Sequence, residues 1–432
     1  MKKSFSRLAV ALVVAAVMSL AFALPAMAAT TTPGQVTLTK DMSVPNGTAT
    51  PAFTFDFVLS QVAVVTQGTG GTANEQNMPG TTFTTTVPSG EAVPFPTDFT
   101  PAQITVPANT TTATTIVDFN ALIPTAAAAT WGFPNAGVFH FLVSEAQGTN
   151  TVGAGSTLTY DQTRYVISVE VVNVPVTATN PRGLEVRNAV TVEVTAPVPA
   201  IAGVQWVAGT TKTDPDWENI YVTTTTFQVN KVITGDTANM DEVFSISTSL
   251  VLPDQARDSV PPQTTAPTAT VVWHTANPNT VPPQVAGAPV TPAPTVAVTG
   301  TGTAADPFVF VAELGHNQRL QFDNVVAGTT FSSTETQLPG FTGQAIVAGP
   351  GATTVNAAEG ANVVVPSAAT RYVSDEGNSS IAFTNNYRDM LLTGLVVGSM
   401  PVLAVLLVAT ALLAMAVASR SRQRIEQLPV AL

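Results

Sequence analysis

Cysteine is missing from all 432 residues of the chain, and only 10% of the residues are charged. Exported domains commonly use disulfides as covalent staples, and the lack of cysteine excludes that chemistry here. The formal net charge is -12 and no basic block occurs, which argues against nucleic-acid binding. The histidines, His140, His274 and His316, stand apart without metal-ligand spacing, so neither a metal site nor a cofactor is predicted. His140 alternates away from the predicted core and reads as a surface residue.

Leucine, glutamate and lysine are also scarce between the two ends of the chain, whereas threonine, alanine, valine and proline dominate. Helices favour the first group, and strands and turns favour valine, threonine and proline-containing segments. The composition therefore predicts an all-β fold. The Pro- and Thr-rich stretch from 253 to 307 is expected to be a long loop or an insertion without regular structure.

Both ends of the chain carry targeting signals. Residues 1–28 have the basic start, apolar run and Ala-Met-Ala ending of a secretory signal peptide, cleaved before Ala29. Residues 389–418 include an uncharged run long enough to cross a bilayer, and the tail 419–432 is basic and is expected to stay in the cytoplasm. The region from 29 to about 388 is thus predicted to lie at the cell surface.

Two of the five lysines sit in strand-like segments that repeat. Lys40 ends VTLTK and Lys231 ends FQVNK, and in each the apolar residues two and four positions earlier share the face of the lysine. Thirteen residues after each lysine, Phe53 and Phe244 open another alternating segment. The repeat predicts two related domains, 29–222 and 223–388, the second with the Pro/Thr-rich insertion.

Each copy also places a carboxylate and an amide inward. Glu145 follows Lys40 by 105 residues and Glu335 follows Lys231 by 104, and both glutamates alternate onto an apolar face. The copies close with WENIY and FTNNY, in which Asn219 and Asn385 lie on the face of their aromatic neighbours. Buried lysine and glutamate tend to become neutral, and a neutral amine can attack a side-chain amide while a protonated carboxyl assists departure of ammonia. The bland alternative is that the lysines snorkel and the polar groups meet solvent at strand ends.

At these residues the sequence resembles the streptococcal pilin isopeptide linker domain, found in tandem in the T-antigen type of major pilin. The segment YDQTRYVISVEV also resembles the penultimate strand of that family. The resemblance implies two tandem Ig-like β-sandwiches with self-generated bonds, Lys40 to Asn219 assisted by Glu145 and Lys231 to Asn385 assisted by Glu335. By analogy with disulfides, each crosslink would restrict the unfolded chain by about 4 to 5 kcal/mol. Such a protein is not an enzyme in the sense of turnover, since each site reacts once.

The resemblance further implies that a sortase joins Lys212 to a neighbouring pilin subunit. A solvated loop lysine is an equal alternative. A sortase substrate should carry an LPxTG-like motif, and here MLLTG stands before the apolar run, with Thr393 and Gly394 as the candidate cleaved pair and leucine where proline is expected.

Three classes of function remain open from the sequence. A pilin-like structural subunit or stalk predicts internal crosslinks. A membrane-anchored adhesin that is not polymerised would bind a host or matrix ligand through first-domain loops around 60–135. A hydrolase would need a carboxylate pair in an aromatic cleft, and no such pair is placed by pattern.

Overall fold

The computed structural model describes residues 32–66, 80–96, 102–127, 129–197, 199–277, 283–388, 410–413 and 415. The predicted signal peptide lies outside these residues, and so does the predicted membrane segment, 389–418, apart from residues 410–413 and 415. Within the described part of the chain, no helix has the length and apolar character needed to cross a membrane.

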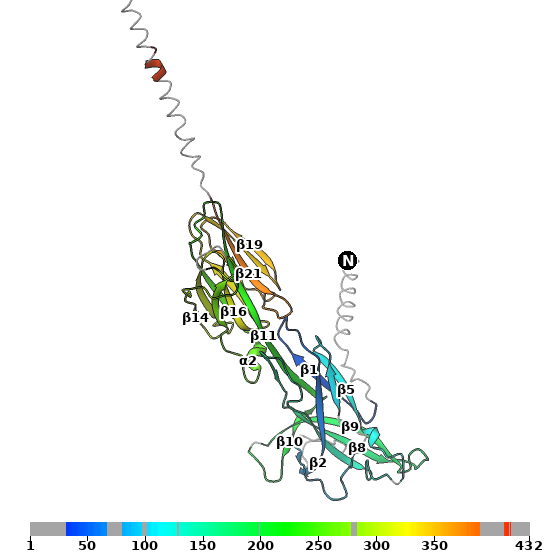
Figure 1. The fold of residues 1–432 in the computed structure, drawn as a ribbon. Helices are drawn as coiled ribbons and strands as arrows, with labels where there is room; N and C mark the ends of the chain where they lie inside the picture. Colours follow the sequence, from blue (N-terminus) through cyan, green and yellow to red (C-terminus); the bar gives the residue numbers. More distant parts are fainter. Residues whose placement is uncertain are drawn as a thin grey trace, which may run out of the picture. The chain divides into compact units, whose positions relative to one another are not determined.

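The all-β prediction is confirmed, and the strands form two compact units (Figure 1). Of the described residues, unit 1 comprises those up to Thr224 together with Pro253–Gln263, and unit 2 comprises Thr225–Leu252 together with those from Thr264 onward. The long strand β11, Asp216–Thr234, contributes its first half to unit 1 and its second half to unit 2.

Unit 1 is a sandwich of two sheets. The smaller sheet has the order β5-β1-β11-β7, in which β1 pairs with β11 in parallel. The larger sheet has the order β3-β10-β9-β8-β6-β2-β4. The strands other than β11 are β1 Gln35–Ser43, β2 Phe53–Thr66, β3 Thr82–Thr84, β4 Gln103–Val106, β5 Thr112–Asp118, β6 Gly137–Glu145, β7 Ser156–Thr159, β8 Arg164–Asn173, β9 Leu184–Thr195 and β10 Trp206–Lys212.

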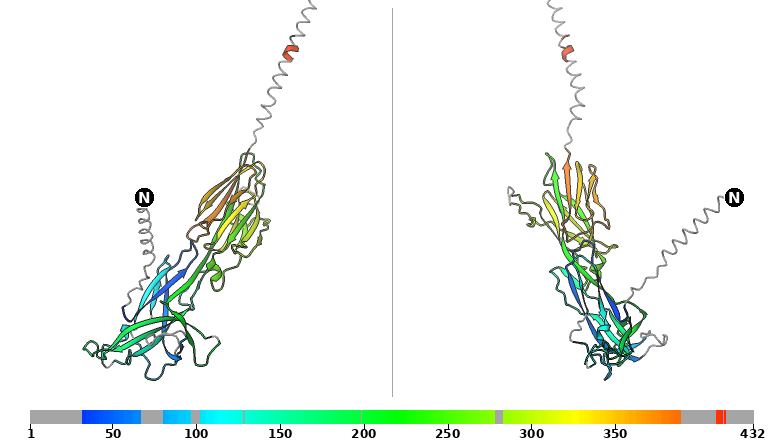
Figure 2. Two further views of the ribbon diagram at one scale, coloured as in Figure 1. Left: turned by 180° about the vertical axis from the view of Figure 1, so that it is seen from behind. Right: turned by 90° about the vertical axis from the view of Figure 1, so that its right-hand side faces the viewer.

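Unit 2 repeats this plan. One sheet runs β13-β16-β11-β21-β18-β19, with β11 and β21 parallel, and the facing sheet runs β14-β15-β12-β17-β20. Figure 2 shows these strands from two further sides. The strands are β12 Phe244–Val251, β13 Thr268–Trp273, β14 Ala297–Thr299, β15 Phe308–Leu314, β16 Gln318–Val326, β17 Thr330–Glu335, β18 Phe341–Ala348, β19 Thr353–Ala357, β20 Val363–Val365 and β21 Ser379–Tyr387.

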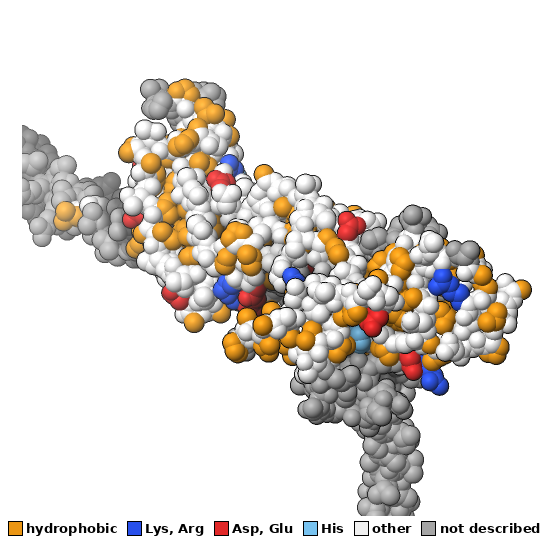
Figure 3. Space-filling model, turned by 90° about the horizontal axis from the view of Figure 1, so that it is seen from below, with side chains coloured by type: hydrophobic (Ala, Val, Ile, Leu, Met, Phe, Trp, Pro, Cys, Tyr) orange, Lys and Arg blue, Asp and Glu red, His pale blue; other side chains and the backbone are white. Residues whose placement is uncertain are grey.

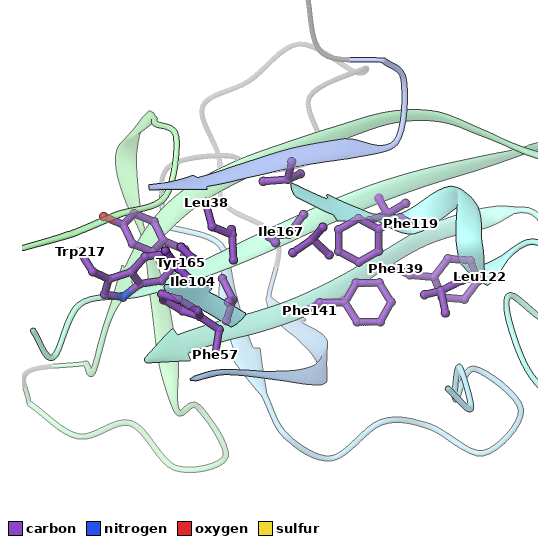
Figure 4. Packing of buried hydrophobic residues seen from close by; sticks show 14 of the residues in the cluster. Leu38, Phe57, Ile104, Phe119, Leu122, Phe139, Phe141, Tyr165, Ile167 and Trp217 are labelled. Atoms are coloured by element: carbon purple, nitrogen blue, oxygen red, sulfur yellow. The ribbon is translucent and has the colours of Figure 1, made fainter. Parts of the chain in front are cut away.

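The core of unit 1 lies between its two sheets and is rich in aromatic residues (Figure 4). At one end of the view, Trp217 from β11 packs against Phe57 from β2, with ring centroids 4.6 Å apart, and against Tyr165 from β8 at 4.9 Å. Strict alternation in β1 produces this arrangement, because Val36, Leu38 and every second residue thereafter point inward. The buried lysine of this strand, Lys40, therefore lies within an apolar core, between Leu38 and Met42 on the inward face.

The interpretation of His140 as a surface residue was wrong. His140 does alternate away from the main core, but the outer face of the larger sheet carries a second, smaller core that contains Phe83 and Val166. The His140 ring lies 5.4 Å from the Phe83 ring, and its Nδ1 is hydrogen-bonded to Ser168 Oγ at 2.7 Å. Burial lowers the pKa of His140 to about 4.

The Pro- and Thr-rich stretch from 253 to 307 is more regular than the sequence predicts. It contains the short helix α2, Asp254–Asp258, and the strands β13 and β14, which pair with β16 and β15. Residues Pro253–Gln263 cluster with unit 1, where the Val260 N–H donates to Thr159 Oγ1 at 2.7 Å. A high proline content therefore does not by itself predict an irregular loop, because such a segment can still form strands that pair with the edge of a sheet. A second short helix, η1, spans Phe119–Leu122.

Charged side chains are few on the face shown in Figure 3 and are scattered among uncharged atoms. Four charged side chains are instead buried in the interior: Lys40, Lys231, Glu145 and Glu335. Charged side chains are rarely fully buried unless they are paired. Each unit therefore holds one buried lysine and one buried glutamate, which are candidates for a functional site.

Candidate functional site

The lysine and asparagine of each copy are brought together by the same strand register. In unit 1, Lys40 on β1 lies opposite Trp217 on β11, and Asn219 is two residues further along β11. In unit 2, Lys231 on β11 lies opposite Phe383 on β21, and Asn385 is two residues further along β21. Because side chains alternate, lysine and asparagine are diagonal neighbours on the inward face in both units.

In unit 1 the carboxylate of Glu145 bridges the amine and the amide. Lys40 Nζ lies 3.3 Å from Glu145 Oε2, and Asn219 Nδ2 donates to Glu145 Oε1 at 2.7 Å. Lys40 Nζ also donates to the main-chain oxygen of Trp217 at 3.0 Å. One carboxyl group thus contacts both the attacking nitrogen and the nitrogen that would leave, which is the geometry a proton shuttle requires.

The carbonyl of Asn219 is held by a group that the sequence did not indicate. The main-chain N–H of Asp161 donates to Asn219 Oδ1 at 2.7 Å. The Asp161 carboxylate accepts from the N–H groups of Thr163 and Glu218, at 2.8 and 3.0 Å, which fixes this turn against β11. A main-chain donor leaves no residue-type signal, so only the folded arrangement reveals it.

In unit 2 the corresponding ion pair is closer. Lys231 Nζ lies 2.7 Å from Glu335 Oε1. The side chain of Gln337 joins the triad, because its Nε2 donates to Glu335 Oε2 at 3.1 Å and to Asn385 Oδ1 at 3.2 Å. Lys231, Glu335 and Asn385 are fully buried.

Burial controls the electrostatics of both triads. Loss of solvent lowers the pKa of Lys40 and lowers that of Lys231 to about 8, against the opposing attraction of the neighbouring glutamates. The same desolvation raises the pKa of Glu145 and of Glu335, again against the attraction of the lysines. The two pKa values of each pair therefore approach one another. Transfer of the proton from ammonium to carboxylate then costs less than it does in water, and this transfer produces a nucleophilic amine.

An aromatic ring lies beside each lysine amine, but in a different register. Lys40 Nζ is 5.0 Å from the centre of the Phe55 ring, and Lys231 Nζ is 3.8 Å from the centre of the Phe244 ring. The sequence repeat aligns Phe244 with Phe53, so the facing ring shifts by two residues between the units. Such a shift keeps the side chain on the same face of the strand.

The other two residues singled out from the sequence lie apart from the triads. Lys212 is the exposed last residue of β10, and Asp214 and Thr191 line a surface hollow with it. Thr393 lies outside the described residues. No group of three or more His, Asp or Glu side chains in the described part of the chain could hold a metal ion.

No family model matches the sequence, and no curated protein matches it. Among solved structures, the major pilin from Streptococcus pyogenes is 16% identical, with a TM-score of 0.30 and coverage of 83% of this chain and 99% of that chain. The T-13 major pilin of S. pyogenes is 14% identical, with a TM-score of 0.29 and coverage of 83% and 98%. A pilus-presented adhesin is 10% identical, with a TM-score of 0.22 and coverage of 82% and 99%. Likenesses at this level establish neither a family nor the role of any residue.

Proposed function

We propose that the protein is a pilin-like structural subunit of the cell surface, stabilised by one self-generated Lys–Asn isopeptide bond in each unit. The observation that carries the proposal is the buried Lys–Glu–Asn triad, formed twice by the same strand register in a chain with five lysines and no cysteine. A standing buried ion pair contributes little net stability, because desolvation offsets the attraction. An amide bond would remove the lysine charge permanently.

The chemistry follows from the contacts of unit 1. A proton passes from Lys40 Nζ to Glu145, and the neutral amine attacks the side-chain amide carbon of Asn219. The N–H of Asp161 stabilises the negative charge that develops on Asn219 Oδ1. Glu145 then delivers this proton to Asn219 Nδ2, which it contacts at 2.7 Å, and ammonia leaves. The bonded Nζ gives up its second proton to the carboxylate, so Glu145 ends the reaction protonated. The product is one amide bond and one ammonia molecule.

The rest of the proposal concerns location and assembly. The signal peptide, the membrane segment and the basic tail predict export and anchoring at the surface, with domains at 29–222 and 223–388. Exposure of Lys212 at the end of β10 makes it accessible to a sortase that would join it to Thr393 of a neighbouring subunit. An anchored adhesin or stalk that does not polymerise would share the same crosslinked units.

The test is the mass of the ectodomain, residues 29–389, measured under denaturing conditions. We expect a deficit of two ammonia molecules, reduced to one in Glu145→Ala and to one in Glu335→Ala. Peptide mapping should place the lost ammonia between Lys40 and Asn219 in one case and between Lys231 and Asn385 in the other. A wild-type mass without a deficit would reduce the triads to packing and remove the basis for the proposal.

A further inference from the structure

Gln337 is a buried polar residue that the three-residue reaction does not use. It lies two residues after Glu335, beyond the end of β17, and its side chain turns into the sandwich. Its Nε2 contacts both the carboxylate of Glu335 and the carbonyl oxygen of Asn385, at 3.1 and 3.2 Å. Its main-chain N–H donates to Asn362 Oδ1 at 3.2 Å, which anchors the position from which the side chain enters.

The orientation of this amide carries a cost. Gln337 Oε1 is buried, and none of the described residues donates a hydrogen bond to it. Buried polar atoms are nearly always paired, and an exception in a folded protein calls for an explanation, of which a catalytic role is one. Here the amide directs both of its N–H groups at the triad while its own oxygen remains unpaired.

A glycine on the neighbouring strand leaves the space that the amide occupies. Gly343 on β18 is paired directly with Asn385 on β21. A Cβ atom built at Gly343 would lie 2.1 Å from Gln337 Nε2 and 2.2 Å from Val363 Cγ2, far inside van der Waals contact. Any other residue at this position would therefore push the Gln337 amide away from Asn385.

We infer that Gln337 is a catalytic residue of the second crosslinking reaction, an inference that rests on the proposed function. As the Nζ–Cγ bond forms between Lys231 and Asn385, the electron pair of the carbonyl moves onto Oδ1, and Gln337 Nε2–H stabilises it there. When the pair returns, the Cγ–Nδ2 bond breaks. The proton that Glu335 takes from the Lys231 ammonium reaches Nδ2, and ammonia leaves. The proton that the bonded Nζ loses stays on Glu335.

The first unit shows why this role is specific to the second. Gln147 has the same spacing from Glu145, yet it does not contact Asn219. Its Nε2 donates instead to the main-chain oxygen of Asp161 at 3.1 Å, while the Asp161 N–H serves Asn219 Oδ1. The two units thus supply the same hydrogen bond to the asparagine carbonyl, one from the main chain and one from a glutamine side chain.

The experiment follows both crosslinks in the full chain during cell-free translation. Samples are quenched in denaturant at intervals and digested with chymotrypsin, which can cut at Tyr221 and so separates the crosslink at Asn219 from that at Lys231. Gln337→Met keeps the length and removes the donor. Because removal of one oxyanion donor slows acyl transfer by about 100-fold or more, we expect that loss for the second crosslink and an unchanged rate for the first.

Matched controls separate this role from packing. Gln344→Leu changes a half-buried glutamine on β18 of the same unit, hydrogen-bonded to Asn356, and should leave both rates unchanged. Gln147→Met should leave the first crosslink within a few-fold of wild type. Pulse proteolysis of the same samples reports when unit 2 folds, and Gln337→Met should acquire protection as early as wild type does.

Gly343→Ala is the second variant, and it tests the inference even if Gln337→Met folds poorly. It displaces the amide without changing the triad, so the second crosslink should slow to a similar degree. In the double variant Gln337→Met with Gly343→Ala, the rate of the second crosslink should equal that of Gln337→Met alone, because both changes remove the same hydrogen bond to Asn385. Wild-type chains with neither crosslink would contradict the proposed function. Wild-type rates of the second crosslink in folded Gln337→Met and Gly343→Ala chains would overturn the catalytic role of Gln337 and leave the proposed function standing.

Discussion

Removal of Asn385 should reveal how much stability the second crosslink contributes. Asn385→Ala eliminates the amide that Lys231 would attack, and it also removes a buried side chain and its hydrogen bond with Gln337. The two effects can be separated by making the same change in a Glu335→Ala background, in which no crosslink can form. The difference between the two costs is the covalent contribution.

The loop closed by this bond fixes the expected magnitude. Residues 231 and 385 enclose about 155 residues, and chain-entropy arguments assign about 5 kcal/mol to a crosslink that closes a loop of this length. The loss of packing and of one buried hydrogen bond adds about 1–3 kcal/mol. Asn385→Ala should therefore cost about 6–8 kcal/mol in the wild-type background and about 1–3 kcal/mol in the Glu335→Ala background.

Hydrogen exchange measured by mass spectrometry in increasing guanidinium chloride is the appropriate assay, because peptides from β18 and β21 report on unit 2 alone. The intact mass of each variant must first establish whether the crosslink is present. A coupling free energy below about 2 kcal/mol, in chains whose wild-type parent carries the bond, would refute the loop-entropy reasoning.

Three further outcomes are expected. The reactive form of the second triad shares one proton between Lys231 and Glu335, and this proton is lost above the lowered pKa of Lys231, about 8. The crosslinking rate, measured in a pulse-labelled time course, should therefore be level near neutral pH and fall about tenfold per pH unit above pH 8. The pKa of His140 is lower in the folded chain than in the unfolded chain, so the unfolded chain binds more protons between pH 6.5 and about 4. As the pH falls through this range, unit 1 should lose up to about 3 kcal/mol of its free energy of unfolding. The variant His140→Phe should not show this loss. Lys212→Ala should abolish high-mass ladders on cells while both internal crosslinks still form, and ladders that persist would exclude Lys212 as the linkage.

Alternation in the sequence was sufficient to predict which residues point inward. Lys40, Glu145 and Asn219 each sit in a strand whose apolar neighbours recur at every second position, and the structure buries all three. Strand partners were not predictable, since no local pattern shows that β1 pairs in parallel with β11 across more than a hundred residues. The diagonal contact between amine and amide depends on that pairing.

Two features of the interior escaped prediction for different reasons. Gln147 and Gln337 follow their glutamates at the same spacing and with the same parity, but both lie beyond the end of a strand, where alternation no longer fixes direction. His140 was placed outward correctly relative to the main core, but the alternating pattern cannot show that a second core covers that face. Long-range packing decides both cases.

Strand β11 carries both Asn219 and Lys231, so the two proposed bonds meet on one strand only 12 residues apart. A load applied between Lys40 and Asn385 would pass through the first bond, along this short stretch and through the second bond. With both bonds formed, only the 12 residues between Asn219 and Lys231 could be extended, to roughly 40 Å. Without crosslinks, the 345 residues between Lys40 and Asn385 could be extended to roughly 1,200 Å. Nearly all of the polypeptide would thus be withheld from extension, and the protein would act as a tether of fixed length.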